Sequence, residues 1–340
     1  MKTILAACLA FIFSFVTPSR AAGWRPISGQ WRMEPPRIVQ YDRAATLPVG
    51  DRIRIASYNI ANFTDGLEDR EPRIPAHAEN QAKAAAPLVA EIDPDILVIQ
   101  EIENETSLQL LNQALPSPYP VAAITRFSGS PDWTEKLNLA VLARLPIRGL
   151  RELDFGELHG RTSPPRGLLS FFVELGPQHN LLVYAVHLKS NFGGQRAINS
   201  AERRNALRIL REDADEFRRT YSDSRWEVLV LGDMNTDSDL RDFTRDPTLR
   251  PLADWVDLWR GRPISERETI PTRYGDPTQV FPPAAFDRFV VSKELTQSPW
   301  VVGDPQVLQK GVNTADVLAV PGADPDHASD HYPVYLDIQR

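Results

Sequence analysis

The sequence predicts an α+β fold in which β-sheets pack on each other and helices cover the outside. Short runs of β-branched residues alternate with helical stretches along most of the 340 residues. Two neighbouring runs, 168–175 and 181–186, are predicted to form a hairpin. Hairpins mixed with helical crossovers do not suit a purely parallel sheet, so facing sheets are the simpler solution. The composition, 42 % hydrophobic and 24 % charged, is that of an ordinary globular chain, and one large domain is the simplest fit.

The N-terminus predicts export. Residues 1–22 begin with the basic start Met1-Lys2-Thr3, continue with the apolar run Ile4–Val16 and end in small residues, which is the pattern of a secretory signal peptide. The run is shorter than the roughly 20 residues of a spanning helix, so we expect no stable membrane insertion and a periplasmic or extracellular location. The single cysteine, Cys8, lies in this signal, so the mature chain forms no internal disulfide. Residues 23–50, rich in Pro, Arg and Gly, predict an extended N-terminal arm, and 51–340 form the main domain.

The elements of the main domain follow from periodicity. Residues 52–58 alternate as a strand does, 80–91 are Ala-rich and helical, and 197–219 form a long Arg/Glu-laced amphipathic helix. Residues 104–115 are also predicted to be helical. The remaining predicted strands are 95–100, 137–143, 168–175, 181–186, 227–231, 286–291 and 333–338. Segments rich in Pro, Asp and Gly, at 126–136, 155–166, 191–196 and 311–328, are predicted loops, which often carry function when long.

Polar residues stand at the ends of these apolar strands. They are Asn59, Glu101, His187, Asp233 with Asn235, Asp287, and the pair Asp330-His331 before the last strand. A single strand-end Asn or Asp usually caps a turn. The whole set in this order instead indicates side chains presented to a common cleft at a sheet edge.

Six stretches carry a resemblance to a known family. They are Ile55–Ile60, Ile99–Asn104, His187–Ser190, Leu231–Asn235, Phe286–Arg288 and Ser329–Pro333. In this order they resemble the endonuclease/exonuclease/phosphatase (DNase I-like) superfamily, and within it bacterial secreted nuclease-like members. The resemblance implies a four-layer αββα sandwich of two facing mixed sheets, with the site at one edge of the sheets.

The resemblance also implies a metal site. Glu101 is the leading ligand, with Asn59 beside it and Asp330 as a third. Carboxylate and amide oxygens suit Mg²⁺, which keeps several waters, and Mn²⁺ is the alternative cation. Such a cation and several donors are needed because a phosphodiester repels a nucleophile and has a poor leaving group.

The remaining roles concern the proton and the phosphate. By resemblance, His331 is the general base for the attacking water and Asp287 orients it, since imidazole titrates near neutral pH. Asp233 and Asn235 hold the water and a phosphate oxygen. His187 and Arg166 bind the phosphate, and His187 is also a candidate to protonate the leaving oxygen, while the planar guanidinium suits phosphate.

Some positions depart from the family pattern. Ala61 stands where many relatives carry an acidic residue, and Asn62 and Asp65 are the candidates to replace it. No partner that would orient His187 is evident. Glu135 is a candidate for that role, although an exposed loop glutamate is the commoner reading of such a residue.

Other clusters admit simpler readings. Asp324 and Asp326 allow a structural Ca²⁺ site, but solvated loop acids are the alternative, and no zinc signature accompanies His327. The basic residues Arg203, Arg204, Arg208 and Arg211 allow a nucleic-acid groove, although such a stripe is more often the solvated face of a helix paired with Glu202, Glu212 and Asp213. His77, His159 and His179 lie in polar surroundings and are expected at the surface.

The protein is predicted to be a secreted or periplasmic metal-dependent phosphodiesterase, namely a nuclease that acts on DNA. It is also predicted to be a monomer. The alternative keeps the site and changes the substrate to a phospholipid, sphingomyelin or a small phosphorylated compound. A catalytically silent binding protein would have lost Glu101, Asp233 or His331, and all three are present. The formal charge of −7 argues against tight nonspecific binding of polyanions over the whole surface, but not against a local basic groove.

Overall fold

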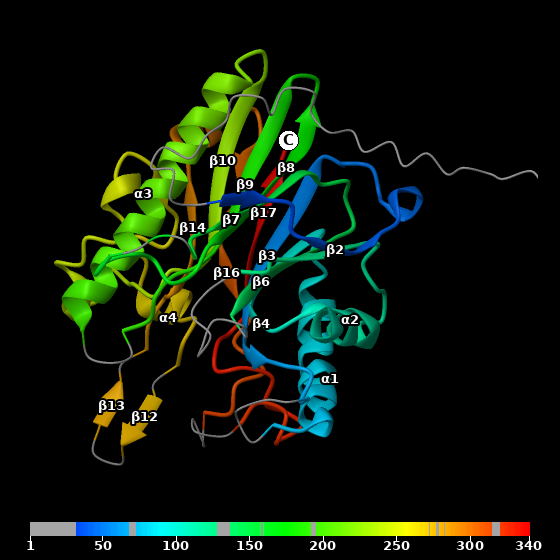
Figure 1. Cartoon of the computed structure of the whole chain (residues 1–340), viewed down its shortest axis with the longest axis vertical. Helices are drawn as coiled ribbons and strands as arrows, with labels where there is room; N and C mark the ends of the chain where they lie inside the picture. The colour runs from blue at the N-terminus through cyan, green and yellow to red at the C-terminus, as the bar shows by residue number, and fades with distance from the viewer. Residues whose placement is uncertain are drawn as a thin grey trace, which may run out of the picture.

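Two large β-sheets lie face to face in the computed structural model of the chain, and helices cover their outer sides (Figure 1). The structure describes residues 32–67, 73–127, 137–156, 158, 160–191, 195–271, 273–276, 279–281, 283–314 and 320–340. Helix α3 covers one sheet, and helices α1 and α2 cover the other. This arrangement confirms the predicted α+β class and its αββα layers.

The first sheet has seven strands in the order β1-β7-β8-β9-β10-β14-β11. Its central pair, β9 and β10, is parallel, and β14 runs antiparallel to β10. The strands are β1 Arg32–Glu34, β7 Arg148–Asp154, β8 Leu168–Gly176, β9 His179–His187, β10 Arg225–Asp233, β11 Val256–Asp257 and β14 Asp287–Val291.

The second sheet has eight strands, with the path β15-β17-β3-β4-β6-β5-β2 and β16 paired to β17. Strands β3 and β4 are parallel at its centre, and β17 runs antiparallel to β3. The strands are β2 Arg37–Tyr41, β3 Arg52–Phe63, β4 Ile96–Ile102, β5 Val121–Ile124, β6 Asn138–Ala143, β15 Val301–Val302, β16 Gln306–Val307 and β17 Val334–Gln339. A separate hairpin joins β12 Arg273–Asp276 and β13 Gln279–Phe281.

The three long helices match the predicted segments. They are α1 Pro75–Ile92, α2 Glu105–Ala114 and α3 Arg196–Thr220. The shorter helical elements are α4 Ile264–Arg267, α5 Lys293–Thr296, η1 Arg43–Ala45, η2 Arg241–Phe243 and η3 Arg250–Leu252. Helix α1 begins with a proline, whose missing N–H costs nothing in the first turn, and ends where Asp93 adopts a left-handed conformation.

Side-chain alternation divides the interior into three cores. Along β4, Ile96 and Val98 face the opposite sheet, whereas Leu97 and Ile99 face α1 and α2. The same alternation along β10 sends one set of residues between the sheets and the other toward α3. Both faces of the central strands are therefore buried, which explains their nearly continuous apolar runs. Each fully buried aliphatic side chain contributes about 1.5–3 kcal/mol.

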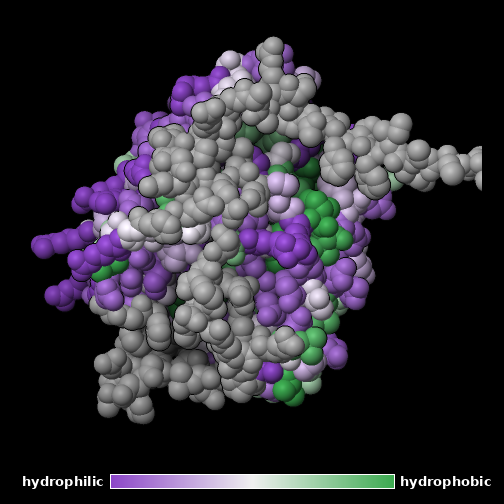
Figure 2. Space-filling model, in the orientation of Figure 1, coloured by the Kyte–Doolittle hydropathy of each residue, from purple (hydrophilic) through white to green (hydrophobic). Residues whose placement is uncertain are grey.

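The exposed side of α3 is hydrophilic, as Figure 2 shows for that side of the molecule. Arg208 pairs with Glu212, and Arg211 pairs with Asp215 and Asp254. These pairs agree with the interpretation that the basic residues form the solvated face of a helix and pair with its acids. Arg203 differs from the others because it is buried at 1 % exposure.

Part of the predicted arm belongs to the sheets. Strand β1 pairs with β7 at the edge of one sheet, and β2 pairs with β5 at the edge of the other. Backbone pairing at both edges makes residues 32–41 part of the fold rather than a separate extension. The predicted signal peptide and the start of the arm lie outside the described residues, as do Glu135 and His159. Among the described residues, no helix is both long enough and apolar enough to cross a bilayer.

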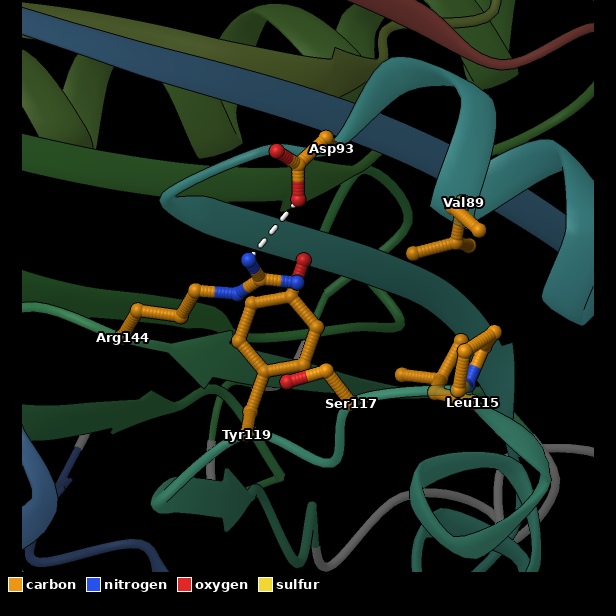
Figure 3. A pocket seen from close by; sticks show the side chains of 8 residues that line it. Val89, Asp93, Leu115, Ser117, Tyr119 and Arg144 are labelled. Atoms are coloured by element: carbon orange, nitrogen blue, oxygen red, sulfur yellow. Dashed lines mark ion pairs between the residues drawn. The ribbon is translucent and has the colours of Figure 1, made fainter.

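A cavity of about 190 Å³ lies between α1 and the segment that follows α2 (Figure 3). Arg144 pairs with Asp93 at 2.8 Å and lies over the ring of Tyr119, 4.8 Å from its centre. Asp93 precedes β4, whereas Glu101 stands near the other end of that strand. The cavity is therefore at the edge of the sheet opposite to the strand-end polar residues.

Candidate active site

The candidate active site begins where the core between the two sheets runs out of apolar residues. The inward-facing positions of β3, β9, β10 and β14 are apolar inside the sandwich. At the end of each strand that lies nearest the site, the same alternation places an inward-facing polar residue at the edge of the sheets. These residues are Asn59, His187, Asp233 and Asp287. Alternation of side chains along a strand thus explains why these four polar residues converge.

Glu101 reaches the site by an exception to this alternation. Gln100 already faces inward, where its side chain pairs with Ser57, so a regular strand would turn Glu101 toward the helices. The register between β3 and β4 instead shifts after Asn59–Gln100 and resumes at Phe63–Ile102. Glu101 adopts a left-handed conformation with φ 61°, and Ala61 and Asn62 are also left-handed, with φ 55° and 48°. Left-handed non-glycine residues cost about 1 kcal/mol or more each, so this bulge stores strain at the site.

Asn59 links the two acidic residues of the site. Its amide nitrogen donates to Glu101 Oε1 and to Asp233 Oδ2, both at 3.1 Å. Its amide oxygen accepts from the backbone of Ala61 at 3.0 Å. In this arrangement Asn59 acts as a donor toward the acids, whereas the predicted ligand role would use its oxygen. That role stays a prediction.

Asp233 stands at the centre of three neighbouring strands. In register it lies opposite His187 of β9 on one side and opposite Asp287 of β14 on the other. Gly232, which precedes it, has φ 132°, and a Cβ there would lie 2.0 Å from the carbonyl oxygen of Val186. Only glycine allows the two parallel strands to approach in this way.

Asn235 and Arg166 meet at one carbonyl group. The Asn235 amide donates to Leu188 O at 3.0 Å and to Asp233 Oδ2 at 2.9 Å. Arg166 Nη1 donates to the same Leu188 oxygen at 2.8 Å. The structure therefore brings together the two residues that were predicted to hold phosphate oxygens, although they come from opposite sides of β9.

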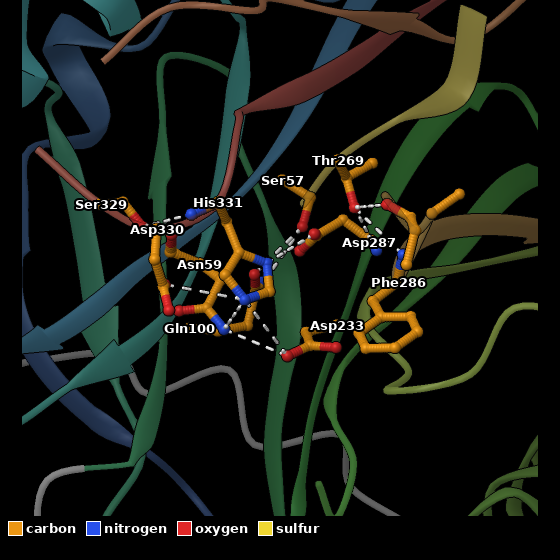
Figure 4. A network of polar contacts seen from close by, with 12 residues as sticks. Ser57, Asn59, Gln100, Asp233, Thr269, Phe286, Asp287, Ser329, Asp330 and His331 are labelled. Atoms are coloured by element: carbon orange, nitrogen blue, oxygen red, sulfur yellow. Dashed lines mark hydrogen bonds and ion pairs between the residues drawn. The ribbon is translucent and has the colours of Figure 1, made fainter. Parts of the chain in front are cut away.

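His331 is held by hydrogen bonds on its ring and on its backbone (Figure 4). Its Nδ1 lies 2.7 Å from Asp287 Oδ2, so the carboxylate accepts the ring proton and leaves Nε2 as the basic nitrogen. Nε2 lies 3.5 Å from the Asn59 amide and 4.0 Å from Asp233 Oδ2. The His331–Asp287 pair thus directs the basic Nε2 toward Asn59 and Asp233, as the predicted roles of His331 and Asp287 require.

His187 faces the same acids from the other side. Its Nε2 lies 3.4 Å from Glu101 Oε1 and 3.6 Å from Asp233 Oδ2. Its Nδ1 is buried, and no described residue hydrogen-bonds to it. Burial, with the positive charges of Arg166, His331 and Lys189, lowers the pKa of His187 well below its usual range. The imidazole is therefore neutral at pH 7 in the metal-free protein.

Asp233 has the opposite shift. Burial raises its pKa to about 6; the charge of His331 lowers it, and those of Asp287 and Glu101 raise it further. Crowded carboxylates that ionise against their neighbours are a common feature of active sites. A nearby positive charge would lower the free-energy cost of ionising Asp233.

One group of three potential metal donors occurs in the described part of the chain. Donor atoms of Glu101, His187 and Asp233 lie within 4.8 Å of one another. Two carboxylates with one imidazole fit a divalent cation, and their mutual repulsion favours its binding. The group contains the predicted ligand Glu101. Asp330 lies outside it, with Oδ1 3.8 Å from His331 Nε2, so its ligand role stays a prediction.

The other candidate donors do not belong to this group. Asp65 accepts from the backbone of Leu67 and from Asn104, which caps α2. Asn62 contributes its backbone N–H, which donates to Glu101 Oε2 at 2.9 Å. Asp324 accepts from Asn313 and from the backbone of Asp326, and neither acid belongs to a three-donor group among the described residues.

Two supporting residues went unnoticed in the sequence. Ser329 Oγ donates to Asn59 O at 2.6 Å and accepts from the backbone of His331 at 3.0 Å, so it ties the histidine loop to β3. Thr269 Oγ1 accepts from the backbone of Asp287 at 3.2 Å. Ser329 stands directly before Asp330-His331, so this motif gives a signal for it, whereas Thr269 is isolated in sequence.

Comparison with protein families identifies the chain. The endonuclease/exonuclease/phosphatase family matches residues 56–331, which include every residue of the candidate site. The chain belongs to this family. Members are divalent-metal-dependent phosphoesterases, which supports that general activity for this endonuclease/exonuclease/phosphatase protein. A comparison with curated proteins gave no match.

Solved structures share the fold of this family member at low identity. TDP2 from D. rerio, in a complex with a single-strand DNA product, matches with a TM-score of 0.55 and 20 % identity over 86 % of this chain and 100 % of that one. An endonuclease/exonuclease/phosphatase family protein from Bacteroides thetaiotaomicron matches with a TM-score of 0.55 and 17 % identity over 84 % and 94 %. One from Beutenbergia cavernae has a TM-score of 0.53 and 17 % identity over 85 % and 72 %. The predicted closeness to secreted nucleases stays a prediction.

Proposed function

We propose that this protein is an exported phosphodiesterase that uses a divalent cation, Mg²⁺ or Mn²⁺, to hydrolyse nucleic acid, and DNA first. One observation carries the proposal. The His331–Asp287 pair directs a basic nitrogen toward Asp233 and Asn59, while Glu101, His187 and Asp233 gather donor atoms for a cation. General-base catalysis and charge stabilisation are the two requirements of phosphodiester hydrolysis.

His331 would take the proton from the attacking water. The hydrogen bond from Nδ1 to Asp287 leaves the lone pair on Nε2 and stabilises the imidazolium that forms. Asp233 Oδ2 lies 4.0 Å from Nε2, so the water would bind next to this carboxylate. Asp287 and Asp233 are both buried, which keeps the His331–Asp287 pair oriented before substrate binds.

The phosphate would bind beside Arg166. Arg166 donates one N–H to Leu188 O, which fixes the direction of its guanidinium group, and Asn235 holds the same carbonyl and Asp233 with its two N–H groups. The remaining guanidinium N–H groups suit nonbridging oxygens. Glu101, Asp233 and the neutral His187 would hold a divalent cation, which would supply positive charge against the negative charge that develops on the phosphate.

Two further observations bear on the substrate. TDP2 from D. rerio was crystallised with a single-strand DNA product, which supports a nucleic-acid substrate for a chain of the same fold. The second candidate is a lipid phosphodiesterase, and the exposed side chains of Leu67 and Ile74, at 60 % and 52 %, favour it. They lie near the two ends of the segment that leaves β3 and returns to α1, and Arg73 in that segment donates to Ala61 O at 3.3 Å.

The test offers both substrate classes to the same preparation. Purified mature protein is incubated with plasmid DNA, RNA, sphingomyelin vesicles and inositol phosphates, with Mg²⁺, with Mn²⁺ and with EDTA. We expect cleavage of DNA with a divalent cation and none with EDTA. Hydrolysis of the lipid alone would show that the nuclease proposal is wrong. Leu67→Glu is the matched variant, because it should reduce activity on vesicles and leave DNA cleavage intact.

A further inference from the structure

One glutamine is buried in the apolar face of α1. Of the buried residues of this helix, all of which the structure describes, Gln81 alone is polar, and its exposure is 0 %. Its neighbours on that face include Ala82 and Ala85, which pack in the core between the helix and the sheet. A buried amide loses its hydrogen bonds to water, so it is tolerated only where the protein supplies partners.

The partners of Gln81 are three backbone carbonyls. Its Nε2 donates to Ile60 O at 2.5 Å and to Ala61 O at 3.1 Å. It also donates to Ala328 O at 2.9 Å. The side-chain oxygen accepts from Arg73 Nη1 at 2.7 Å, which fixes which end of the amide faces the carbonyls. Two of the carbonyls belong to the bulge of β3, and the third lies in the loop before β17.

The two bulge carbonyls belong to peptide groups whose N–H groups hold the site. A trans peptide is planar, so its C=O and N–H point in opposite directions, and fixing one fixes the other. The N–H opposite the Ile60 carbonyl belongs to Ala61 and donates to Asn59 Oδ1 at 3.0 Å. The N–H opposite the Ala61 carbonyl belongs to Asn62 and donates to Glu101 Oε2 at 2.9 Å. From the α1 side of the bulge, the glutamine therefore directs both N–H groups toward the site.

This support is needed because the bulge is strained. Ala61, Asn62 and Glu101 are left-handed, a conformation that residues other than glycine keep only where the surrounding structure enforces it. The N–H of Ala61 occupies the side-chain oxygen of Asn59, so the nitrogen of that amide faces Glu101 and Asp233. If the two carbonyls lost their donor, the peptide groups could rotate, and both side chains would lose the N–H groups that orient them.

The third carbonyl connects the same glutamine to the loop of the base. Ala328 is followed directly by Ser329, whose Oγ donates to Asn59 O and accepts from the backbone N–H of His331 (Figure 4). Gln81 therefore contacts the chain on the β3 side and on the His331 side. One side chain thus fixes the separation between the bulge and the base.

We propose that Gln81 is a positioning residue of the active site. By holding three carbonyls it sets the orientation of Asn59 and Glu101, and it fixes both relative to the loop of His331. The inference rests on the proposed phosphodiesterase function and deepens it, and it holds for any phosphodiester substrate. Gln81 is fully buried behind the bulge, so its loss should act on kcat and on cation binding rather than on KM.

Gln81→Met tests this role because methionine has a similar length and cannot donate a hydrogen bond. The matched control is Asn112→Leu, which removes two buried hydrogen bonds to the backbone of Tyr119, at 2.8 and 3.1 Å, at the opposite edge of the sheet. Both variants should be less stable in urea unfolding. In the metal-free protein, the amides of Ala61 and Asn62 should exchange with solvent about tenfold faster in Gln81→Met. Their exchange should be unchanged in the control.

Turnover and cation binding give two further readouts. On the phosphodiester that the wild type cleaves fastest, Gln81→Met should lower kcat by about 10–100-fold and leave KM within about twofold. Its affinity for Mn²⁺, measured by isothermal titration calorimetry, should fall by about tenfold. Asn112→Leu should change none of these quantities. Gln81→Asn keeps the amide on a shorter side chain and should give intermediate values, and it provides the same test if Gln81→Met does not fold.

The outcomes separate this inference from the proposed function. Unchanged amide exchange in Gln81→Met, or equal losses of kcat in Gln81→Met and Asn112→Leu, would overturn the inference and leave the phosphodiesterase proposal intact. Faster exchange and weaker Mn²⁺ binding in Gln81→Met, with no cleavage of any phosphodiester by the wild type, would support the positioning role and overturn the proposed function.

Discussion

Asp233→Asn should gain stability relative to the wild type as the pH rises, although it damages the site. Burial holds the pKa of Asp233 at about 6, above its usual value of 3.8. The unfolded chain therefore ionises this carboxyl more easily than the folded chain does. Folding stability from this group is fully present below the unfolded pKa and is lost as pH rises through about 6. A neutral asparagine avoids that loss at every pH.

The shift sets an upper limit on the effect. The difference between about 6 and 3.8, at 1.36 kcal/mol per unit, corresponds to about 3 kcal/mol. Asp233 accepts hydrogen bonds from Asn59 and Asn235, and changes in those bonds add an offset that does not vary with pH. The informative quantity is therefore the change with pH. We expect the stability of the variant relative to the wild type to grow by about 1–3 kcal/mol between about pH 4.5 and about pH 7.5.

Urea unfolding in EDTA at several pH values measures this change directly. Asp223→Asn, in an exposed turn, is the matched control, and its relative stability should stay flat. Addition of Mg²⁺ or Mn²⁺ at neutral pH should stabilise the wild type more than Asp233→Asn, because the cation binds the ionised carboxylate. Parallel pH curves for the wild type and Asp233→Asn would refute the argument that crowded carboxylates destabilise the empty site.

Four other substitutions test the base assignment and the packing around the site. His331→Ala should lower turnover on a phosphodiester by at least about 10²-fold, and Asp287→Asn by a similar factor because the ring proton loses its acceptor; normal rates in both would refute the base assignment. Gly232→Ala should lower the free energy of unfolding by about 2 kcal/mol or more, since its Cβ would meet a carbonyl oxygen at 2.0 Å. Asp237→Asn should cost about 3–5 kcal/mol in urea unfolding, because Arg267 and the fully buried Arg288 both pair with it; a cost below about 1 kcal/mol would contradict that reading.

Long apolar runs were predictable because burial on both faces leaves a strong signal. The predicted strand 95–100 corresponds to β4, and the predicted helix 197–219 corresponds to α3 almost residue for residue. Strand β5 has four residues and β7 has a mixed polar pattern, so neither has a strand pattern that differs from the sequence around it. The sequence predicts an arm where β1 and β2 form, because edge strands paired on one side do not need a continuous apolar sequence.

The candidate site was predictable by residue type and less so by geometry. Asp233, Asp287 and His187 could be anticipated at strand ends, but their adjacency depends on strand order and register, which pair residues distant in sequence. The Glu101 side chain points into the site because of a bulge with three left-handed residues, and no local sequence pattern predicts this bulge. Thr269 acts only because its loop packs against the start of β14.

The sequence by itself determined which chemical groups this protein possesses and, through side-chain alternation, which faces of its strands are buried. Those properties are local, since they depend on residue type and on the period of two along a strand. Only the tertiary structure decided which atoms meet: that the Asn59 nitrogen rather than its oxygen faces the acids, that His187 joins Glu101 and Asp233, and that Asp330 is outside this donor group. Contacts of this kind depend on register, bulges and loop packing, which are set by interactions between residues far apart in the chain.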